Sequence, residues 1–213
     1  MSIATKANPW PGGNMTSSAG RGGLSPTDLR QQVEASCASL DPGKIDLLYL
    51  HAPDGDTPIE DTLDELKKLH AEGKFARLGL SNFPAWEVVY IHKRCSEIGL
   101  PVPSVYQGMY NCVTRACEPE LIPALKKLDM RFLVYNPLAG GLLTGKHAIE
   151  TGGDVAEGRG RFKDNAMYKD RFWKPEYFQA VDQIRAACEA SGVEGRVVYS
   201  HKYTYPQLKN QPW

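Results

Sequence analysis

The regular alternation of short apolar runs with amphipathic stretches is the feature that most constrains the fold of this chain. Strands are expected where apolar or β-branched residues cluster, at residues 2–5, 45–50, 76–80, 104–107 and 131–135. Helices are expected where apolar residues recur with helical spacing, at residues 26–40, 57–72, 84–98, 118–128 and 175–191. Strands that alternate with helices favour a parallel sheet, either an open doubly wound sheet or a (β/α)₈ barrel.

Local signals support these boundaries. Ser25 is suited to cap the first helix, with Pro26 at its first position and Asp28 completing a capping-box pattern. Gly73 and Gly99 are placed to end the second and third helices. The segment at 45–50 is almost continuously apolar, which is typical of a parallel strand that is buried on both faces.

The first turn of an open dinucleotide-binding sheet usually carries the motif G-x-G-x-x-G, and this sequence contains none. A glycine-dense run that could contact phosphate occurs late, at Ala139, Gly140 and Gly141, with Lys146 nearby. The sequence therefore favours the barrel. We expect about five strand–helix units of a (β/α)₈ TIM barrel over residues 1–192, and an irregular tail over residues 193–213.

Composition narrows the class of protein. Lys plus Arg and Asp plus Glu both number 25, so the formal net charge is zero, and neither nucleic acid nor a membrane surface is an expected partner. The first residues do not resemble a signal peptide. The five cysteines are odd in number and form no CxxC pair, so we interpret them as free thiols in the cytoplasm.

Each expected strand ends in polar residues, and active sites of such barrels lie at the carboxyl ends of the strands. These residues are Lys6, His51, Ser81 with Asn82, Gln107 with Tyr110, and Tyr135 with Asn136. Taken singly, each has an ordinary structural explanation, such as a turn or a helix cap. Together they suit carbonyl reduction. A metal site at His51, Asp54 and Asp56 is a weaker alternative, because a second histidine at ligand spacing is missing.

Several motifs resemble the aldo-keto reductases, and most closely the aflatoxin-aldehyde and succinic-semialdehyde reductase subfamily. They are IATKANPW at 3–10, LYLHAPD at 48–54, GLSNF at 79–83, YQGMYN at 106–111, YNPLAGGLLTGK at 135–146 and GRF at 160–162. The resemblance implies a (β/α)₈ barrel that transfers hydride from NADPH to an aldehyde or ketone.

The resemblance also implies roles for individual residues. Lys6 matches the lysine that lowers the pKa of a catalytic tyrosine, and His51 matches the histidine that orients the substrate carbonyl. Ser81, Asn82 and Gln107 match the residues that hold the nicotinamide carboxamide, and Tyr135 matches the ring that stacks on nicotinamide. A loop around the pyrophosphate would consist of Asn136, Pro137, Leu138, Ala139, Gly140, Gly141, Leu142, Leu143, Thr144, Gly145 and Lys146. Arg161, Tyr168 and Arg171 lie where the subfamily has substrate and cofactor contacts.

The chain also departs from the family's pattern. The catalytic Asp and Tyr, the first two strands and the last strand–helix unit have no counterpart here, so we expect a defective or strongly impaired reductase. The alternative is a non-catalytic truncated isoform or pseudoenzyme that associates with a full-length relative as a homo- or heterodimer.

Overall fold

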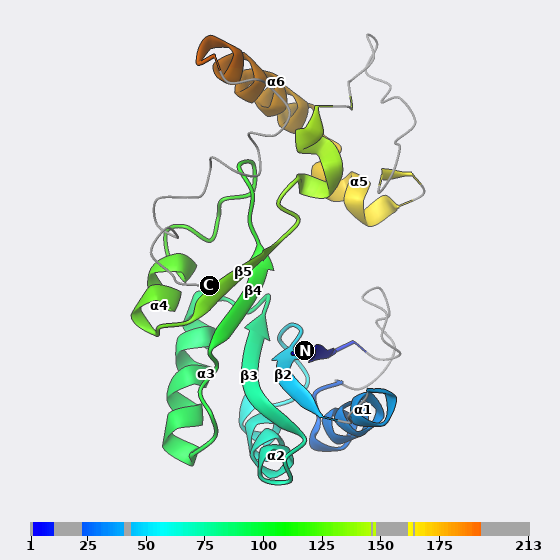
Figure 1. Ribbon diagram of the computed structural model, residues 1–213, viewed down its shortest axis with the longest axis vertical. Helices are drawn as coiled ribbons and strands as arrows, with labels where there is room; N and C mark the ends of the chain where they lie inside the picture. Colours follow the sequence, from blue (N-terminus) through cyan, green and yellow to red (C-terminus); the bar gives the residue numbers. More distant parts are fainter. Residues whose placement is uncertain are drawn as a thin grey trace. The chain divides into compact units, whose positions relative to one another are not determined.

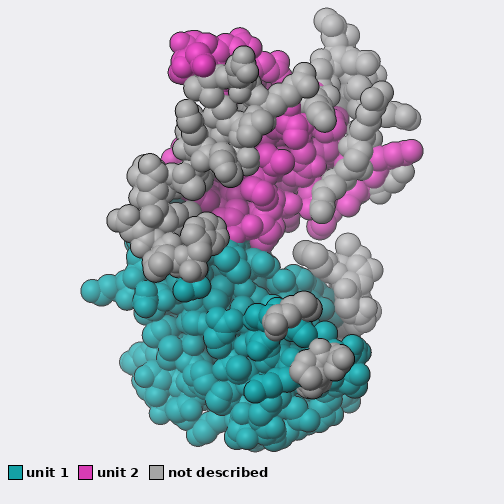
Figure 2. All heavy atoms as spheres, viewed as in Figure 1, with its two compact units in different colours: residues 1–108, 117–133 teal, residues 109–116, 134–213 magenta. Residues whose placement is uncertain are grey.

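The computed structural model describes residues 2–10, 23–40, 44–145, 147, 162–163 and 165–192. The chain separates into two compact units (Figure 2). The first unit contains residues 1–108 and 117–133, and the second contains residues 109–116 and 134–213. Each unit has its own hydrophobic cluster.

Five strands form one sheet in sequence order (Figure 1). They are β1 (Ala4–Ala7), β2 (Ile45–Leu50), β3 (Phe75–Ser81), β4 (Val105–Met109) and β5 (Arg131–Tyr135). The pairs β1–β2, β2–β3 and β3–β4 are parallel. A doubly wound sheet reverses its strand order at a switch point, whereas this order runs straight from first to last strand. The fold is therefore that of an incomplete (β/α)₈ barrel, as predicted.

Helices alternate with these strands and cover one face of the sheet. They are α1 (Pro26–Ser39), α2 (Ile59–Ala71), α3 (Ala85–Ile98) and α4 (Leu121–Lys127). Leu48, Leu80 and Tyr106 point from the sheet into the cluster that the helices share. Residues of opposite parity, Leu47, Tyr49 and Val105, form a separate cluster, as expected of a sheet whose side chains alternate between faces.

The local signals in the sequence explain most boundaries. The Ser25 hydroxyl accepts the backbone N–H of Asp28 at 3.2 Å and donates to the Asp28 carboxylate at 2.7 Å, which caps α1. Gly99 adopts the left-handed conformation with φ of 73° and ends α3. β2 and β5 have the predicted limits. β1 begins two residues later than predicted, because its pairing with β2 runs from Ala4 beside Leu47 to Ala7 beside Leu50.

The second unit contains two elements that the sequence did not predict. These are the 3-10 helix η2 (Ala139–Thr144) and the short helix α5 (Ala166–Phe172), which precede the predicted α6 (Pro175–Ala190). Their apolar side chains join Phe178 and Val181 of α6 in one buried cluster. Among the helices that the structure describes, none is both long and apolar enough to cross a bilayer.

Candidate active site at the strand ends

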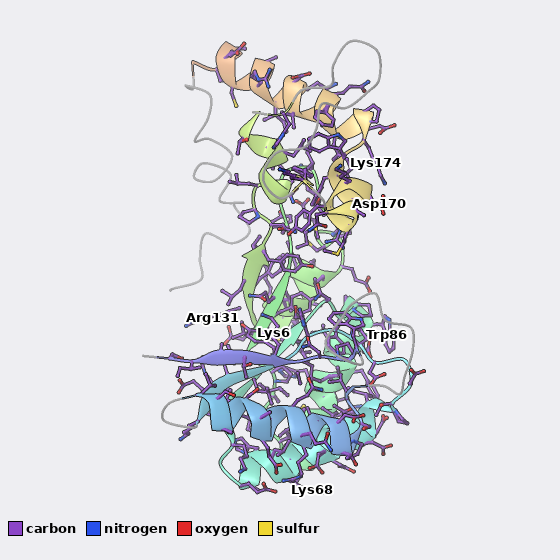
Figure 3. All side chains as sticks on the ribbon, turned by 90° about the vertical axis from the view of Figure 1, so that its right-hand side faces the viewer. Lys6, Lys68, Trp86, Arg131, Asp170 and Lys174 are labelled. Carbon is purple, nitrogen blue, oxygen red and sulfur yellow. The ribbon has the colours of Figure 1, made fainter. Side chains whose placement is uncertain are left out.

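Four of the predicted site residues lie at the carboxyl ends of neighbouring strands in the first unit. Lys6 (labelled in Figure 3) is on β1, and the backbone N–H of His51 continues the ladder by donating to the Ala7 carbonyl at 2.9 Å. Ser81 and Gln107 face each other in the β3–β4 register. The strand register therefore gathers Lys6, His51, Ser81 and Gln107 at one edge of the sheet.

Tyr49 of β2 lies between Lys6 of β1 and Gly79 of β3 in the strand register. The Lys6 ammonium lies over the Tyr49 ring, 5.3 Å from its centroid, in a cation–π contact. On the opposite side, the ring occupies the space above Gly79, where an added Cβ would lie 2.6 Å from the ring carbons. Tyr49 therefore meets the lysine with the face of its ring, and burial raises the pKa of its hydroxyl.

His51 is held on two sides by the segment that follows β1. Its Nδ1 atom is hydrogen-bonded to the side-chain oxygen of Asn8. The Trp10 ring packs against it edge to face, with centroids 5.0 Å apart. Partial burial lowers the pKa of His51, and the charge of Lys6 lowers it further. The imidazole is therefore neutral near pH 7.

Asn82 connects the ends of β2 and β3. Its side-chain nitrogen donates to the His51 carbonyl at 2.8 Å and to the Ser81 hydroxyl at 3.0 Å. Its φ of 62° is in the left-handed region, which asparagine tolerates better than most residues. The Asn82 amide thus fixes the backbone beneath His51 and orients the Ser81 hydroxyl.

The remaining predicted residues belong to the second unit, where several hydrogen bonds converge on Asn136. The Asn136 side chain accepts the Tyr168 hydroxyl at 3.0 Å, and its carbonyl accepts the Asn111 side chain at 3.0 Å and the Ala139 N–H at 2.9 Å. Gly140 has a φ of 70°, and an added Cβ there would lie 2.7 Å from the Tyr168 ring. Tyr168 therefore packs directly on the predicted pyrophosphate loop.

The turn that follows Asn136 is tight and partly buried. Pro137 is exposed and Leu138 is partly buried, whereas Ala139, Leu142 and Leu143 are buried in the second cluster. Gly141 and Gly145 have positive φ values of 112° and 66°. Thr144 closes the turn by donating to the Gly141 carbonyl at 2.7 Å. The predicted residues Lys146 and Arg161 lie outside the described residues.

The charge of Arg171 acts on the hydroxyl of Tyr135. Burial raises the pKa of Tyr135, the positive charge of Arg171 opposes this shift, and Tyr168 adds to it. Arg171 itself is exposed on α5. Arg171 and Tyr168 thus lie close enough to Tyr135, within the second unit, to affect the ionisation of its hydroxyl.

The metal alternative finds no support in the geometry. Within residues 2–10, 23–40, 44–145, 147, 162–163 and 165–192, no three His, Cys, Asp or Glu side chains are grouped to hold an ion. The Asp54 carboxylate instead accepts the backbone N–H groups of Leu24 and Asp56, both at 3.0 Å. Its role in the described structure is to join two loops.

The sequence did not predict roles for Asn8, Trp10 or Gln32. Asn8 lies two residues beyond Lys6, so the alternation of side chains along an extended segment places both on the same face. This period of two was the signal that could have identified Asn8. Gln32 carries no comparable signal, because nothing local in α1 marks a contact with the loop after β1.

Comparison with known proteins gives consistent matches. The model of the Aldo/keto reductase family matches residues 1–207. Over 192 residues, 89% of this chain, the sequence is 47% identical to human aflatoxin B1 aldehyde reductase member 2 and 45% identical to human member 4. These matches cover 51% and 55% of the two relatives. An aldo-keto reductase of Monascus ruber, pigE, is 39% identical over 76% of the chain and 48% of its own length. The chain spans about half the length of the curated relatives it matches.

Proposed function

The chain belongs to the aldo/keto reductase family, and we propose that its strand-end residues serve the reduction of an aldehyde or ketone by a nicotinamide cofactor. The observation that carries this proposal is the grouping of Lys6, His51, Ser81 and Gln107 at one edge of the sheet. These side chains come from four successive strand ends, so the register alone brings them together.

The donor set fits a nicotinamide cofactor. A carboxamide offers one acceptor and two donor positions, and the Ser81 hydroxyl and Gln107 amide can satisfy both kinds. Asn82 would support this contact indirectly, because its amide already orients Ser81. When bound, the reduced cofactor supplies hydride. We infer that this cofactor is NADPH. Its nicotinamide would stack on Tyr135, and residues 136–146 would contact its pyrophosphate. Arg171 would also contact the cofactor.

His51 is the residue that we infer meets the oxygen of the substrate. It is partly buried, and Trp10 and Asn8 hold its ring. Lys6 supplies the positive charge of the site. The relatives of this chain include aflatoxin B1 aldehyde reductases, which supports an aldehyde as substrate. Tyr168 and Arg161 are the inferred substrate contacts. We also propose residues 1–192 as the family domain, the cytoplasm as its location, and a homo- or heterodimer with a full-length relative as its assembly.

A second candidate function is favoured by the contact between Lys6 and Tyr49. The lysine meets the face of the ring rather than the hydroxyl, so Tyr49 is not arranged as a proton donor next to a lysine. General acid catalysis contributes about 10²–10⁴-fold to such reactions. We therefore infer that residues 1–213 by themselves bind nucleotide with little turnover, as a pseudoenzyme or a partner of a longer relative would.

One experiment tests both proposals. NADPH and NADH would be titrated into the purified chain while nicotinamide fluorescence is recorded, and 4-nitrobenzaldehyde would then be added to measure oxidation. We expect saturable NADPH binding, weakened by Gln107→Leu by roughly three- to tenfold, the equivalent of one net hydrogen bond. Gln31→Ala, an exposed change on α1, is the matched control.

The outcomes separate the two proposals. A folded chain without nucleotide binding would contradict the proposed use of Ser81 and Gln107. Binding without oxidation would support the non-catalytic candidate. Oxidation at an ordinary enzymatic rate would contradict that candidate and would require a proton donor other than Tyr49.

A further inference from the structure

The glycine-rich turn of the second unit uses several of its backbone N–H groups internally. The N–H groups of Gly141 and Leu143 both donate to the Leu138 carbonyl, at 2.8 and 3.3 Å. The Gly145 N–H donates to the Leu142 carbonyl at 3.1 Å. These groups are engaged in holding η2 together, so they are poorly placed to bind an anion as well. A phosphate at this turn therefore needs a side chain that supplies donors and positive charge.

Arg185 of α6 lies against the end of this turn. Gly145 has a φ of 66°, and the three non-neighbouring atoms closest to the position of its missing Cβ all belong to Arg185. They are Nη2 at 3.0 Å, Nε at 3.7 Å and Cζ at 3.8 Å. A side chain at position 145 would crowd the guanidinium, so the glycine makes room for Arg185 on the turn.

Apolar packing fixes the position of α6 next to η2. Leu142 and Leu143 of η2 share a buried cluster with Val181 of α6. Ile184, about one turn further along α6, packs against the same cluster. Arg185 follows Ile184 directly in the chain, so the packed face of the helix determines where the stem of the arginine begins. The guanidinium is therefore held at the turn by the core of its own unit.

The ion pair of Arg185 is weak enough to be replaced by a ligand. Its Nη1 atom lies 3.3 Å from Asp182 Oδ1, and the two side chains are 45% and 69% exposed. Strong charged hydrogen bonds of this kind are about 2.7–2.9 Å long, and exposed pairs contribute little to stability. A phosphate group could therefore engage two guanidinium nitrogens in the parallel geometry that arginine favours.

We propose that Arg185 is a further cofactor-binding residue, whose guanidinium binds the diphosphate group of the nicotinamide dinucleotide at the end of η2. The nature of this ligand rests on the proposed function, whereas the placement of the guanidinium rests on the contacts of Gly145. Arg185 lies on α6, outside the loop at 136–146 that was inferred above to contact phosphate. NADPH, NADH and ADP share the diphosphate, so Arg185 should contribute equally to the binding of all three.

Isothermal titration calorimetry with the full chain tests the proposal, with ADP as a probe that carries the diphosphate but no nicotinamide. Arg185→Met keeps an apolar stem and should weaken ADP binding by roughly three- to tenfold, the equivalent of one partly exposed hydrogen bond. NADH and NADPH should lose affinity by the same factor. Arg185→Lys keeps the charge without the planar fork and should bind ADP more tightly than the methionine variant. Lys93→Met is the control, since it removes one positive charge from α3 in the first unit.

Four results would overturn the proposal in folded protein, as judged by circular dichroism. They are equal ADP affinity in wild type and Arg185→Met, an equal loss in Lys93→Met, no ADP binding by the wild type, and a loss for NADPH alone. The last result would place the guanidinium at the 2′-phosphate instead. Arg185→Gln takes the place of the methionine variant if the latter does not fold.

The proposed nicotinamide contact fails or succeeds independently. Gln107→Leu should weaken NADPH binding and leave ADP binding unchanged, because ADP has no carboxamide for Gln107 to meet. Arg185→Met should weaken both ligands. Failure of the Arg185 assignment and failure of the proposed function therefore give different patterns across the two variants.

Discussion

At the scale of single residues, the charge of Lys6 acts on His51 at the strand ends. Burial is the larger cause of the lowered His51 pKa, and the lysine charge is the smaller one. Lys6→Met should therefore raise the His51 pKa part of the way toward its ordinary value. A pH titration of the His51 ring protons by NMR measures this. Lys93→Met is a control, since Lys93 is exposed on α3 and pairs with Glu97.

The sign of the associated stability change follows from the same shift. An unfolded chain protonates its His51 near pH 6.5, before the folded chain does. The contribution of this residue to stability is therefore present above pH 6.5 and is lost as the pH falls toward the folded pKa. Unfolding midpoints that rise on acidification through this range in wild type, relative to His51→Gln, would contradict the expected direction.

Gly79 offers a second prediction, because the Tyr49 ring occupies the place of its missing side chain. Gly79→Ala would put a Cβ 2.6 Å from ring carbons of a buried tyrosine, so the ring would have to shift. We expect a loss of roughly 1–3 kcal/mol in the free energy of unfolding. Gly55→Ala is the matched control, since no atom of the residues that the structure describes lies within 4 Å of its added Cβ. Urea unfolding of both variants gives the comparison, and equal midpoints would count against the packing argument.

The strand-end residues could be predicted from the sequence because their position follows from chain order and strand period alone. Lys6, His51, Ser81 and Gln107 required no knowledge of side-chain contacts. Asn8 and Gln32 could not be assigned in this way, since their contact joins a loop to a helix 24 residues away in sequence. Hydrogen bonds of this kind depend on tertiary packing, which a local pattern does not encode.

At the scale of elements, Arg30 joins α1 to α2. Its guanidinium contacts Glu65 at 2.6 Å and Glu72 at 2.8 Å, and these carboxylates raise its pKa. Glu65 is buried, and its other ionic partner is Lys68 at 3.1 Å. A buried carboxylate that loses a partner is costly, whereas an exposed pair contributes little.

Arg30→Met should therefore lower the denaturation midpoint more than Arg94→Met does. The methionine keeps an apolar stem but leaves Glu65 with Lys68 alone among the ion pairs described. Arg94 pairs with Glu97 within the same helix, so its loss should have a small effect. Thermal unfolding of the two variants at low salt tests the ranking. A reversed order would mean that Glu65 gains compensation from water or from a rearranged Lys68.

The limits of an element could be predicted where the hydrophobic pattern of the sequence matches the burial of the side chains. The run at 45–50 is apolar because β2 is buried almost throughout, so its limits were readable in the sequence. η2 was missed because Gly140 and Gly141 interrupt it with positive φ values, which helical periodicity does not anticipate. α5 was missed because seven residues are too few for a periodic signal, although Asn165 caps it by accepting the Tyr168 N–H.

At the scale of the whole molecule, the two units differ in how their cores are built. The core of the first unit combines a sheet with several helices, and residues of β2 and β3 are hydrogen-bonded to strands on both sides. The described core of the second unit is a cluster of side chains from η2, α5, α6 and nearby loops, with aromatic contacts such as Phe162 with Trp173 at 4.5 Å. Separate cores allow separate opening.

Hydrogen exchange should report this difference. Amides of β2 and β3 should exchange slowest, and those of α6 should exchange faster, because local opening of the second cluster does not require the sheet to separate. Phe178→Ala removes a buried ring from that cluster, a change that costs roughly 3–5 kcal/mol in typical cores. It should accelerate exchange over residues 175–190 and leave residues 45–50 and 75–81 nearly unchanged.

The reciprocal variant Leu80→Ala should accelerate exchange in the sheet, since Leu80 of β3 is fully buried in the cluster of the first unit. Peptide-level mass spectrometry resolves these segments. Equal acceleration of both units in either variant would mean that they open as one cooperative body. The prediction that the two hydrophobic clusters open separately would then be wrong.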